Sequence, residues 1–119
     1  MKKLIFMLML LSLGFAETPS EALQKLIELW EKKQFSKYVT TRVDVSKVPD
    51  PKIFKAYPNL LRNMNKRHPG FAKNKIAVYQ EALAIKPRFS KDSTEVLYEV
   101  KSGQVSLIKV NTKWMEVVQ

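Results

Sequence analysis

The chain contains no cysteine, one histidine and three glycines among its 119 residues. The absence of cysteine excludes disulfide bonds, so the folded state depends on side-chain packing for its stability. It also excludes thiolate metal sites, and the single histidine, His68, offers at most one metal ligand. His68 precedes Pro69-Gly70, and we interpret it as an exposed loop residue. With no Gly-rich phosphate loop, Ser-His-Asp set or paired carboxylates, the sequence predicts no cofactor, no metal ion and no catalytic residue.

The chain also lacks an apolar run long enough to span a bilayer. Leu4–Leu13 is shorter than the roughly 20 residues that a spanning helix needs. This run follows Lys2 and Lys3 and precedes the small-x-small sequence Gly14-Phe15-Ala16, a pattern typical of a secretory signal peptide. We therefore predict that residues 1–16 are removed and that residues 17–119 form one domain, with no transmembrane segment after cleavage. No cysteine follows the cleavage site, so the product is expected to be periplasmic or secreted and not a lipoprotein.

Acidic residues are scarce relative to basic ones, and the net charge is +10. Removing Lys2 and Lys3 with the signal peptide leaves a charge of +8. Such a charge favours acidic partners, for example lipid phosphates, anionic polymers or acidic proteins, although it also serves solubility alone. Within the mature chain only Lys32-Lys33 and Lys66-Arg67 are adjacent, and no nucleic-acid-binding motif is present, so no nucleic acid partner is predicted.

The first half of the domain carries helical signals. Thr18-Pro19-Ser20-Glu21 combines a capping box with Pro at the first helical position, and the apolar spacing after it predicts a helix over Pro19–Lys33. Phe35, Tyr38 and Val39 suggest a short helical continuation after a polar break at Lys32-Lys33-Gln34. Residues 40–50 have no assignment.

Two further helices are expected before the sheet. Asp50-Pro51 predicts a short helix that ends or kinks at Pro58, with Leu60, Leu61 and Met64 allowing further turns. Phe71 opens a third helix that ends near Ala84 or Ile85, because Pro87 disfavours helix at the residue before it.

The last part of the chain predicts a three-stranded antiparallel meander. Its strands are Thr94–Val100, Val105–Val110 and Lys113–Val118, with turns at 101–104 and 111–112, and a short strand at 87–90 is an option. Helices followed by consecutive strands indicate an α+β fold, with three helices packed on one face of a curved antiparallel sheet. The residues expected in the core are Leu23, Leu26, Ile27, Trp30, Ile76, Tyr79, Leu83, Val96, Tyr98, Val100 and Leu107.

Several segments together resemble small exported members of the nuclear-transport-factor-2-like superfamily. They are the helix Pro19–Lys33, the helix end Ala82–Pro87, the strand Val96–Val100 and the terminal hairpin Leu107–Met115, which ends on Lys113-Trp114. Thr112 stands where that family usually has Gly. The resemblance implies a cone-shaped, cystatin-like roll whose open end, between the first helix and the concave sheet, is the usual pocket.

The pocket expected at that open end has an apolar and aromatic lining, suited to a lipid-like or aromatic ligand or to a side chain of an envelope protein. Alternatively the same side chains fill the core. The residues are Trp30, Phe35, Tyr38, Phe54, Tyr57 and Trp114.

We therefore predict an exported, non-catalytic binding or accessory module. The sequence does not define its oligomeric state, and a dimer is one of the options. The alternatives are a small enzyme of the ketosteroid-isomerase-like type and a basic envelope-surface protein that binds anionic partners. Glu99 is expected to face outward, away from the core residues with which it alternates, and Tyr38 and Tyr79 are interpreted as core-edge residues. An enzyme would be favoured by carboxyl, Tyr or His groups that converge in the cone with strongly shifted pKa values.

Overall fold

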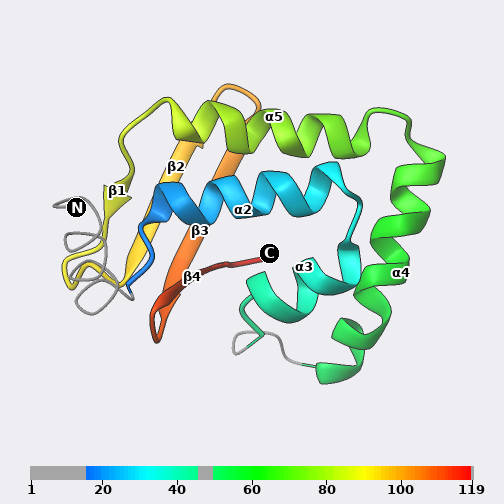
Figure 1. Ribbon diagram of the computed structural model, residues 1–119, viewed down its shortest axis with the longest axis horizontal. Helices are drawn as coiled ribbons and strands as arrows, with labels where there is room; N and C mark the ends of the chain where they lie inside the picture. Colours follow the sequence, from blue (N-terminus) through cyan, green and yellow to red (C-terminus); the bar gives the residue numbers. More distant parts are fainter. Residues whose placement is uncertain (1–15, 46–49, 119) are drawn as a thin grey trace, which may run out of the picture.

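Four helices precede a four-stranded antiparallel sheet in the computed structural model, which describes residues 16–45 and 50–118 (Figure 1). The helices are α2 (Pro19–Glu31), α3 (Phe35–Arg42), α4 (Pro51–Arg67) and α5 (Phe71–Leu83). The strands are β1 (Arg88–Phe89), β2 (Glu95–Val100), β3 (Gly103–Val110) and β4 (Lys113–Glu116), and they pair in chain order. The predicted α+β class is therefore confirmed. The predicted signal peptide lies, apart from Ala16, outside the described residues.

Helix α2 begins with the predicted capping box. The Glu21 N–H donates to Thr18 Oγ1 (3.1 Å), and the Thr18 N–H donates to the Glu21 carboxylate (3.2 Å), so two otherwise unmet donors are satisfied. The helix ends at Glu31 in a Schellman motif: Lys33 takes φ 55°, and the Gln34 N–H donates to the Leu29 carbonyl (2.9 Å). Because this left-handed residue breaks the helix, Phe35–Arg42 forms a separate helix, and the prediction of three helices was wrong by one.

Helix α4 runs through Pro58 from an Asp50 cap, whose side chain accepts from the Lys52 N–H (2.9 Å). Of the two options from the sequence, an end at Pro58 was wrong, whereas the further turns over Leu60, Leu61 and Met64 are present. Buried Leu61 and the half-buried Phe54 and Tyr57 pack against the core on both sides of the proline, and this packing offsets the ring's helix-breaking effect. Helix α5 ends at Leu83, close to the expected end.

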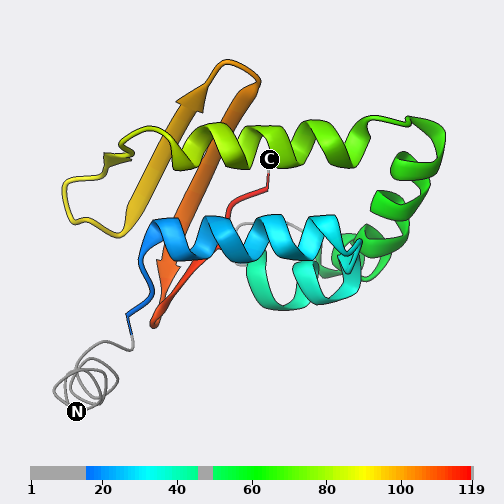
Figure 2. The same cartoon turned by 45° about the horizontal axis from the view of Figure 1, so that its top comes forward.

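The structure contains the predicted antiparallel meander, formed by β2, β3 and β4. Val96 pairs with Leu107 across β2 and β3, and Lys109 pairs with Trp114 across β3 and β4. Asn111, with φ 58°, supplies the left-handed residue of the last turn, while Thr112 does not adopt a positive φ. Helices α2 and α5 lie side by side over one face of the sheet, and α4 crosses beyond their ends (Figures 1 and 2).

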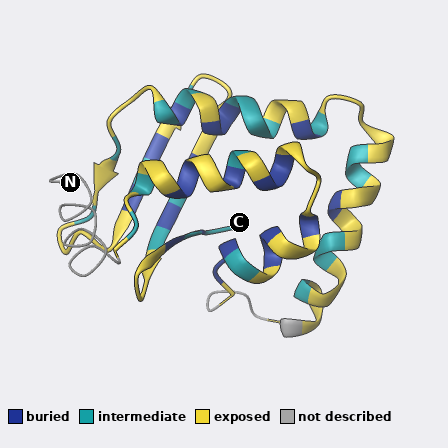
Figure 3. Ribbon diagram, in the orientation of Figure 1, coloured by how far each residue is buried: buried dark blue, intermediate teal, exposed yellow. Residues whose placement is uncertain are grey.

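The core lies between the sheet and helices α2, α3 and α5 (Figure 3). Trp30, 2% exposed, is its centre, with ring contacts to Phe35 and Tyr38, both at 5.3 Å between centroids. Of the expected core residues, Leu23, Leu26, Trp30, Tyr79, Val96, Tyr98 and Leu107 are buried, whereas Ile27, Ile76, Leu83 and Val100 are only half-buried at its margin.

Part of the segment that had no assignment lies against the end of β4. Val43 forms a parallel bridge with Glu116, and the Asp44 N–H donates to the Glu116 carbonyl (2.9 Å). Residues 46–49 lie outside the described residues. The contacts of Val43 and Asp44 fix the backbone of Glu116 where β4 ends.

Candidate functional site

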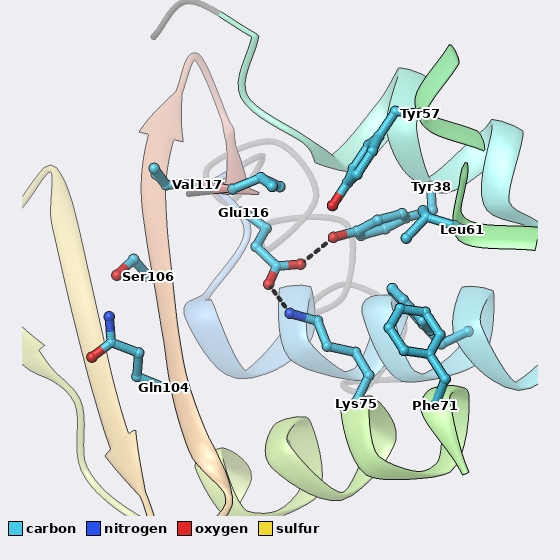
Figure 4. A pocket seen from close by; sticks show the side chains of 11 residues that line it. Tyr38, Tyr57, Leu61, Phe71, Lys75, Gln104, Ser106, Glu116 and Val117 are labelled. Carbon is cyan, nitrogen blue, oxygen red and sulfur yellow. Dashed lines mark hydrogen bonds and ion pairs between the residues drawn. The ribbon is translucent and has the colours of Figure 1, made fainter. Parts of the chain in front are cut away.

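The buried carboxylate of Glu116 accepts three hydrogen bonds from side chains of the helical layer. Its residue is 3% exposed. Oε1 accepts hydrogen bonds from the hydroxyls of Tyr38 (2.5 Å) and Tyr79 (2.6 Å). Oε2 accepts one from Lys75 Nζ (2.7 Å). Figure 4 marks the contacts of Glu116 with Tyr38 and with Lys75. We call Glu116, Tyr38, Tyr79 and Lys75 the floor cluster.

Three elements bring the floor cluster together. Glu116 follows Trp114 by two positions on β4, so both side chains point to the helix-covered face of the sheet. Lys75 and Tyr79 are four residues apart on α5 and therefore share one side of that helix, with Nζ 5.1 Å from the Tyr79 ring centroid. Tyr38 reaches the same carboxylate from α3.

The surroundings hold both tyrosines in the neutral form. Burial raises the pKa of Tyr38 and of Tyr79 well above the usual range, and the neighbouring Glu116 carboxylate raises it further. Both hydroxyls therefore keep their protons and act as donors. A buried carboxylate is costly unless it is paired and hydrogen-bonded, and here two hydroxyls and an ammonium group satisfy it.

A pocket of about 290 Å³ lies above the floor cluster. Its polar lining includes Tyr57, Gln104 and Ser106 besides members of the cluster, and its apolar lining consists of Trp30, Leu61, Phe71, Val117 and Val118. The hydroxyl of Tyr57 points towards Tyr38 and Glu116 (Figure 4). Burial, and then the Glu116 charge, raises the pKa of Tyr57 as well.

The structure brings together only part of the aromatic set that the sequence suggested. Trp30, Tyr38 and Tyr57 line this pocket. Phe35 is buried against Trp30, and Phe54 packs on Tyr57 with ring centroids 6.2 Å apart. Trp114 contacts Phe89 instead, at 6.4 Å. Neither Phe35, Phe54 nor Trp114 is part of the lining.

The polar part of the site was missed. Glu116 and Lys75 received no role from the sequence, and Tyr38 and Tyr79 lie deeper than the core edge, at 1% and 0% exposure. One signal was available: in the strand Lys113–Val118, Glu116 alternates in phase with Trp114, which places a carboxylate on the inward face. An inward carboxylate requires partners, and the apolar helix faces contain tyrosines that can supply them.

A second buried ion pair joins Glu17 to Arg42 of α3, and Glu17 also contacts the terminal hairpin. Arg42 donates to both carboxylate oxygens of Glu17 (2.6 and 2.9 Å), and Lys25 lies 3.1 Å from Oε2. Trp114 donates its indole N–H to the Glu17 carbonyl (2.9 Å) and its backbone N–H to the carboxylate (3.2 Å). Burial raises the pKa of Glu17, but these donors, Arg42 foremost, outweigh it and leave the pKa below its ordinary value. We interpret this pair as a structural contact.

His68 and Glu99 are in less enclosed positions than the floor cluster. His68 is exposed at the end of α4, as expected, and Glu99 is exposed and paired with Arg88, which confirms its outward orientation. Asp44 is buried beside β4.

Within residues 16–45 and 50–118, no group of three or more His, Asp or Glu side chains is placed to hold a metal ion. In the same residues no helix combines the length and apolar character needed to cross a membrane.

Comparisons of this chain with protein-family models, with curated proteins and with solved structures find no match in any of the three. The resemblance to the nuclear-transport-factor-2-like superfamily therefore stays a prediction from sequence.

Proposed function

We propose that this chain is an exported, non-catalytic binding module whose pocket above the floor cluster takes a small ligand with an apolar body and a hydrogen-bond-accepting end. The observation that carries the proposal is the convergence of Tyr38, Tyr79 and Lys75 on the buried Glu116 carboxylate beneath an aromatic pocket. A few convergent polar groups beside aromatic and aliphatic side chains in one concavity are characteristic of ligand sites.

The unused donors define the polar end of the ligand. An ammonium group has three N–H donors, and Lys75, whose side chain is 30% exposed, gives one of them to Glu116. The Tyr57 hydroxyl lines the pocket and makes no hydrogen bond within the described residues. A ligand carboxylate or carbonyl that reaches either group can accept a hydrogen bond from it.

The size and lining of the pocket define the rest of the ligand. A volume of about 290 Å³ is at or below the lower end of the roughly 300–1,000 Å³ typical of ligand sites. Trp30, Phe71 and Leu61 offer flat and branched apolar surfaces. These features favour a small aromatic or branched aliphatic acid, or one side chain of a partner protein, over a long lipid.

The direction of the tyrosine pKa shifts supports binding over acid–base catalysis. General acids and bases work best with a pKa near the operating pH. Burial and the Glu116 charge move the pKa values of Tyr38 and Tyr79 further above neutral pH, and three donors hydrogen-bond the carboxylate. Although two tyrosines with raised pKa values converge on a carboxylate here, these groups are suited to orienting a ligand more than to transferring protons to it.

The proposed location and fold family have more indirect support. Export and cleavage after Ala16 are proposed from the sequence pattern of residues 1–16. The position of α2 across a consecutive antiparallel sheet is compatible with a cone-shaped, cystatin-like roll.

A fluorescence titration tests the ligand proposal. Trp114→Phe leaves Trp30, at the pocket wall, as the sole tryptophan. Benzoate and 3-methylbutanoate should change Trp30 emission, whereas benzylamine, with a cationic end, should bind much more weakly. Adding Tyr57→Phe removes one donor and should weaken benzoate binding roughly 2–10-fold.

Lys75→Met should weaken benzoate binding further, and Lys73→Met is the matched control because Lys73 is exposed on the same helix and does not line the pocket. If no compound changes Trp30 emission, or benzylamine binds as well as benzoate, the proposed function is wrong.

A further inference from the structure

The positive charge of the domain is concentrated in one part of the fold. From Pro51 to Gln80 the chain has seven Lys and Arg residues and no Asp or Glu, so this stretch supplies most of the net charge of +10. Outside it, basic and acidic residues are far more evenly mixed. The stretch corresponds to α4 and most of α5.

Helix α4 carries five of these seven charges on solvent-exposed positions, namely Lys52, Lys55, Arg62, Lys66 and Arg67. No ion pair between described residues involves any of the five. Elsewhere Lys25, Lys32, Arg42, Lys75 and Arg88 do have carboxylate partners. The charge of α4 is therefore not neutralised within the described part of the fold.

The same helix exposes two large apolar side chains. Ile53 is 54% exposed and Leu60 is 52% exposed, and seven residues separate them, so they lie two turns apart along one flank of α4. The adjacent flank, roughly 100° around the helix, buries Leu61 and packs Phe54 against the core. Helix α4 lies at one end of the molecule, with exposed positions along much of its length (Figures 1 and 3).

We infer that the outer face of α4 docks on the surface of a bilayer that contains anionic lipids. An exposed basic helix with apolar residues along one flank is the arrangement of helices that lie in the plane of a membrane interface. Lys and Arg side chains attract lipid phosphates, while Ile53 and Leu60 enter the headgroup boundary beside them. A nucleic acid would be attracted by the charges but would leave the two apolar side chains in water.

Vesicle co-sedimentation tests this docking, with the protein as purified from the producing cell and the same N-terminus in every variant. The probes are vesicles of phosphatidylcholine alone and vesicles enriched in phosphatidylglycerol. We expect binding to the second kind only, weakened by added salt because exposed charges are screened. Since each basic side chain near an anionic surface strengthens binding by roughly fivefold, Lys52→Gln/Lys55→Gln/Lys66→Gln should weaken it about 100-fold.

The matched control removes the same charge from the sheet side of the molecule. Lys91→Gln/Lys101→Gln/Lys109→Gln changes three exposed lysines that make no ion pair within the described residues, and it should leave vesicle binding within a fewfold of the parent. Ile53→Ser/Leu60→Ser should also weaken binding, including the part that survives high salt. Equal loss in the two triple variants would show that net charge, and not α4, attracts the vesicles.

Two further outcomes would overturn the inference. One is the absence of binding to phosphatidylglycerol vesicles. The other is tighter binding to duplex DNA or to poly-glutamate than to the vesicles at equal salt, since that would identify a general polyanion surface. Thermal unfolding of each variant confirms that a loss of binding is not a loss of fold. Docking at this face needs no ligand in the pocket, so its failure and that of the pocket proposal are separate.

Discussion

Lys75 and Glu116 meet across the pocket floor, with Nζ 2.7 Å from Oε2, although 41 positions separate them in the chain. Lys75 comes from α5 and Glu116 from the end of β4, so this contact ties the helical layer to the last strand. The lysine side chain is partly exposed to the pocket while the carboxylate is enclosed. A ligand that binds the Lys75 ammonium group would therefore be connected to the buried Glu116 carboxylate through the single contact between these two side chains.

Removing a tyrosine hydroxyl should show that the floor cluster also stabilises the fold. Tyr79→Phe deletes a donor to a buried charged group, and we expect the free energy of unfolding to fall by about 1.5–3 kcal/mol. Tyr98→Phe is the control, because Tyr98 is equally buried and its hydroxyl makes no hydrogen bond within the described residues. Urea unfolding measures both, and similar losses in the two variants would argue against a special role for Glu116.

The raised tyrosine pKa values predict loss of stability in alkali. Above about pH 10 the tyrosines of the unfolded chain lose protons, whereas Tyr38 and Tyr79 in the folded protein keep theirs. The unfolded state then binds fewer protons, so the free energy of unfolding decreases as pH rises from about 10 towards the folded-state pKa values.

The matched variant for this test is Tyr38→Phe/Tyr79→Phe, which should be less stable at neutral pH but lose less on going to alkaline pH. Chemical denaturation at a series of pH values measures both slopes. Parallel curves for the parent and the double variant would mean that other groups cause the alkaline loss.

The lowered pKa of Glu17 predicts a contribution to stability in the acid range. Since the folded pKa lies below that of the unfolded chain, the stabilisation is complete above about pH 4.3 and is lost as pH falls through the folded value. Glu17→Gln breaks the ion pair with Arg42 and should lower the free energy of unfolding by about 3 kcal/mol at pH 7. The stability of this variant should also fall less steeply as the pH is lowered into the acid range.

Glu28→Gln is the control for Glu17, because it removes an exposed pair with Lys32 and should leave stability unchanged. Thermal melts at pH 7 and in acid compare the two. If the parent and Glu17→Gln lose the same stability between pH 7 and acid, Glu17 is excluded as a source of the acid sensitivity.

Local patterns predicted the elements better than they predicted the site. The capping box of Thr18 and Glu21 and the turn at Asn111 are local, and both lie where the sequence placed them. The polar run Lys32-Lys33-Gln34 indicated the break after α2, but a lysine side chain gives no sign of the left-handed conformation that Lys33 adopts there. Helix α4 continues through Pro58 because of its packing with distant residues. The floor cluster joins residues 38, 75, 79 and 116, so it exists only once α3, α5 and β4 are docked.

The central claim is that the pocket above Glu116 binds a small acid, and amide chemical-shift mapping by NMR tests it most directly. Titrating the isotope-labelled protein with benzoate should shift the resonances of Tyr57, Leu61, Phe71, Lys75 and Val117, all from the pocket wall. The amides around Phe89 and Trp114, which pack together away from this lining, should not move. Shifts confined to that second region, or none at any benzoate concentration, would contradict the account.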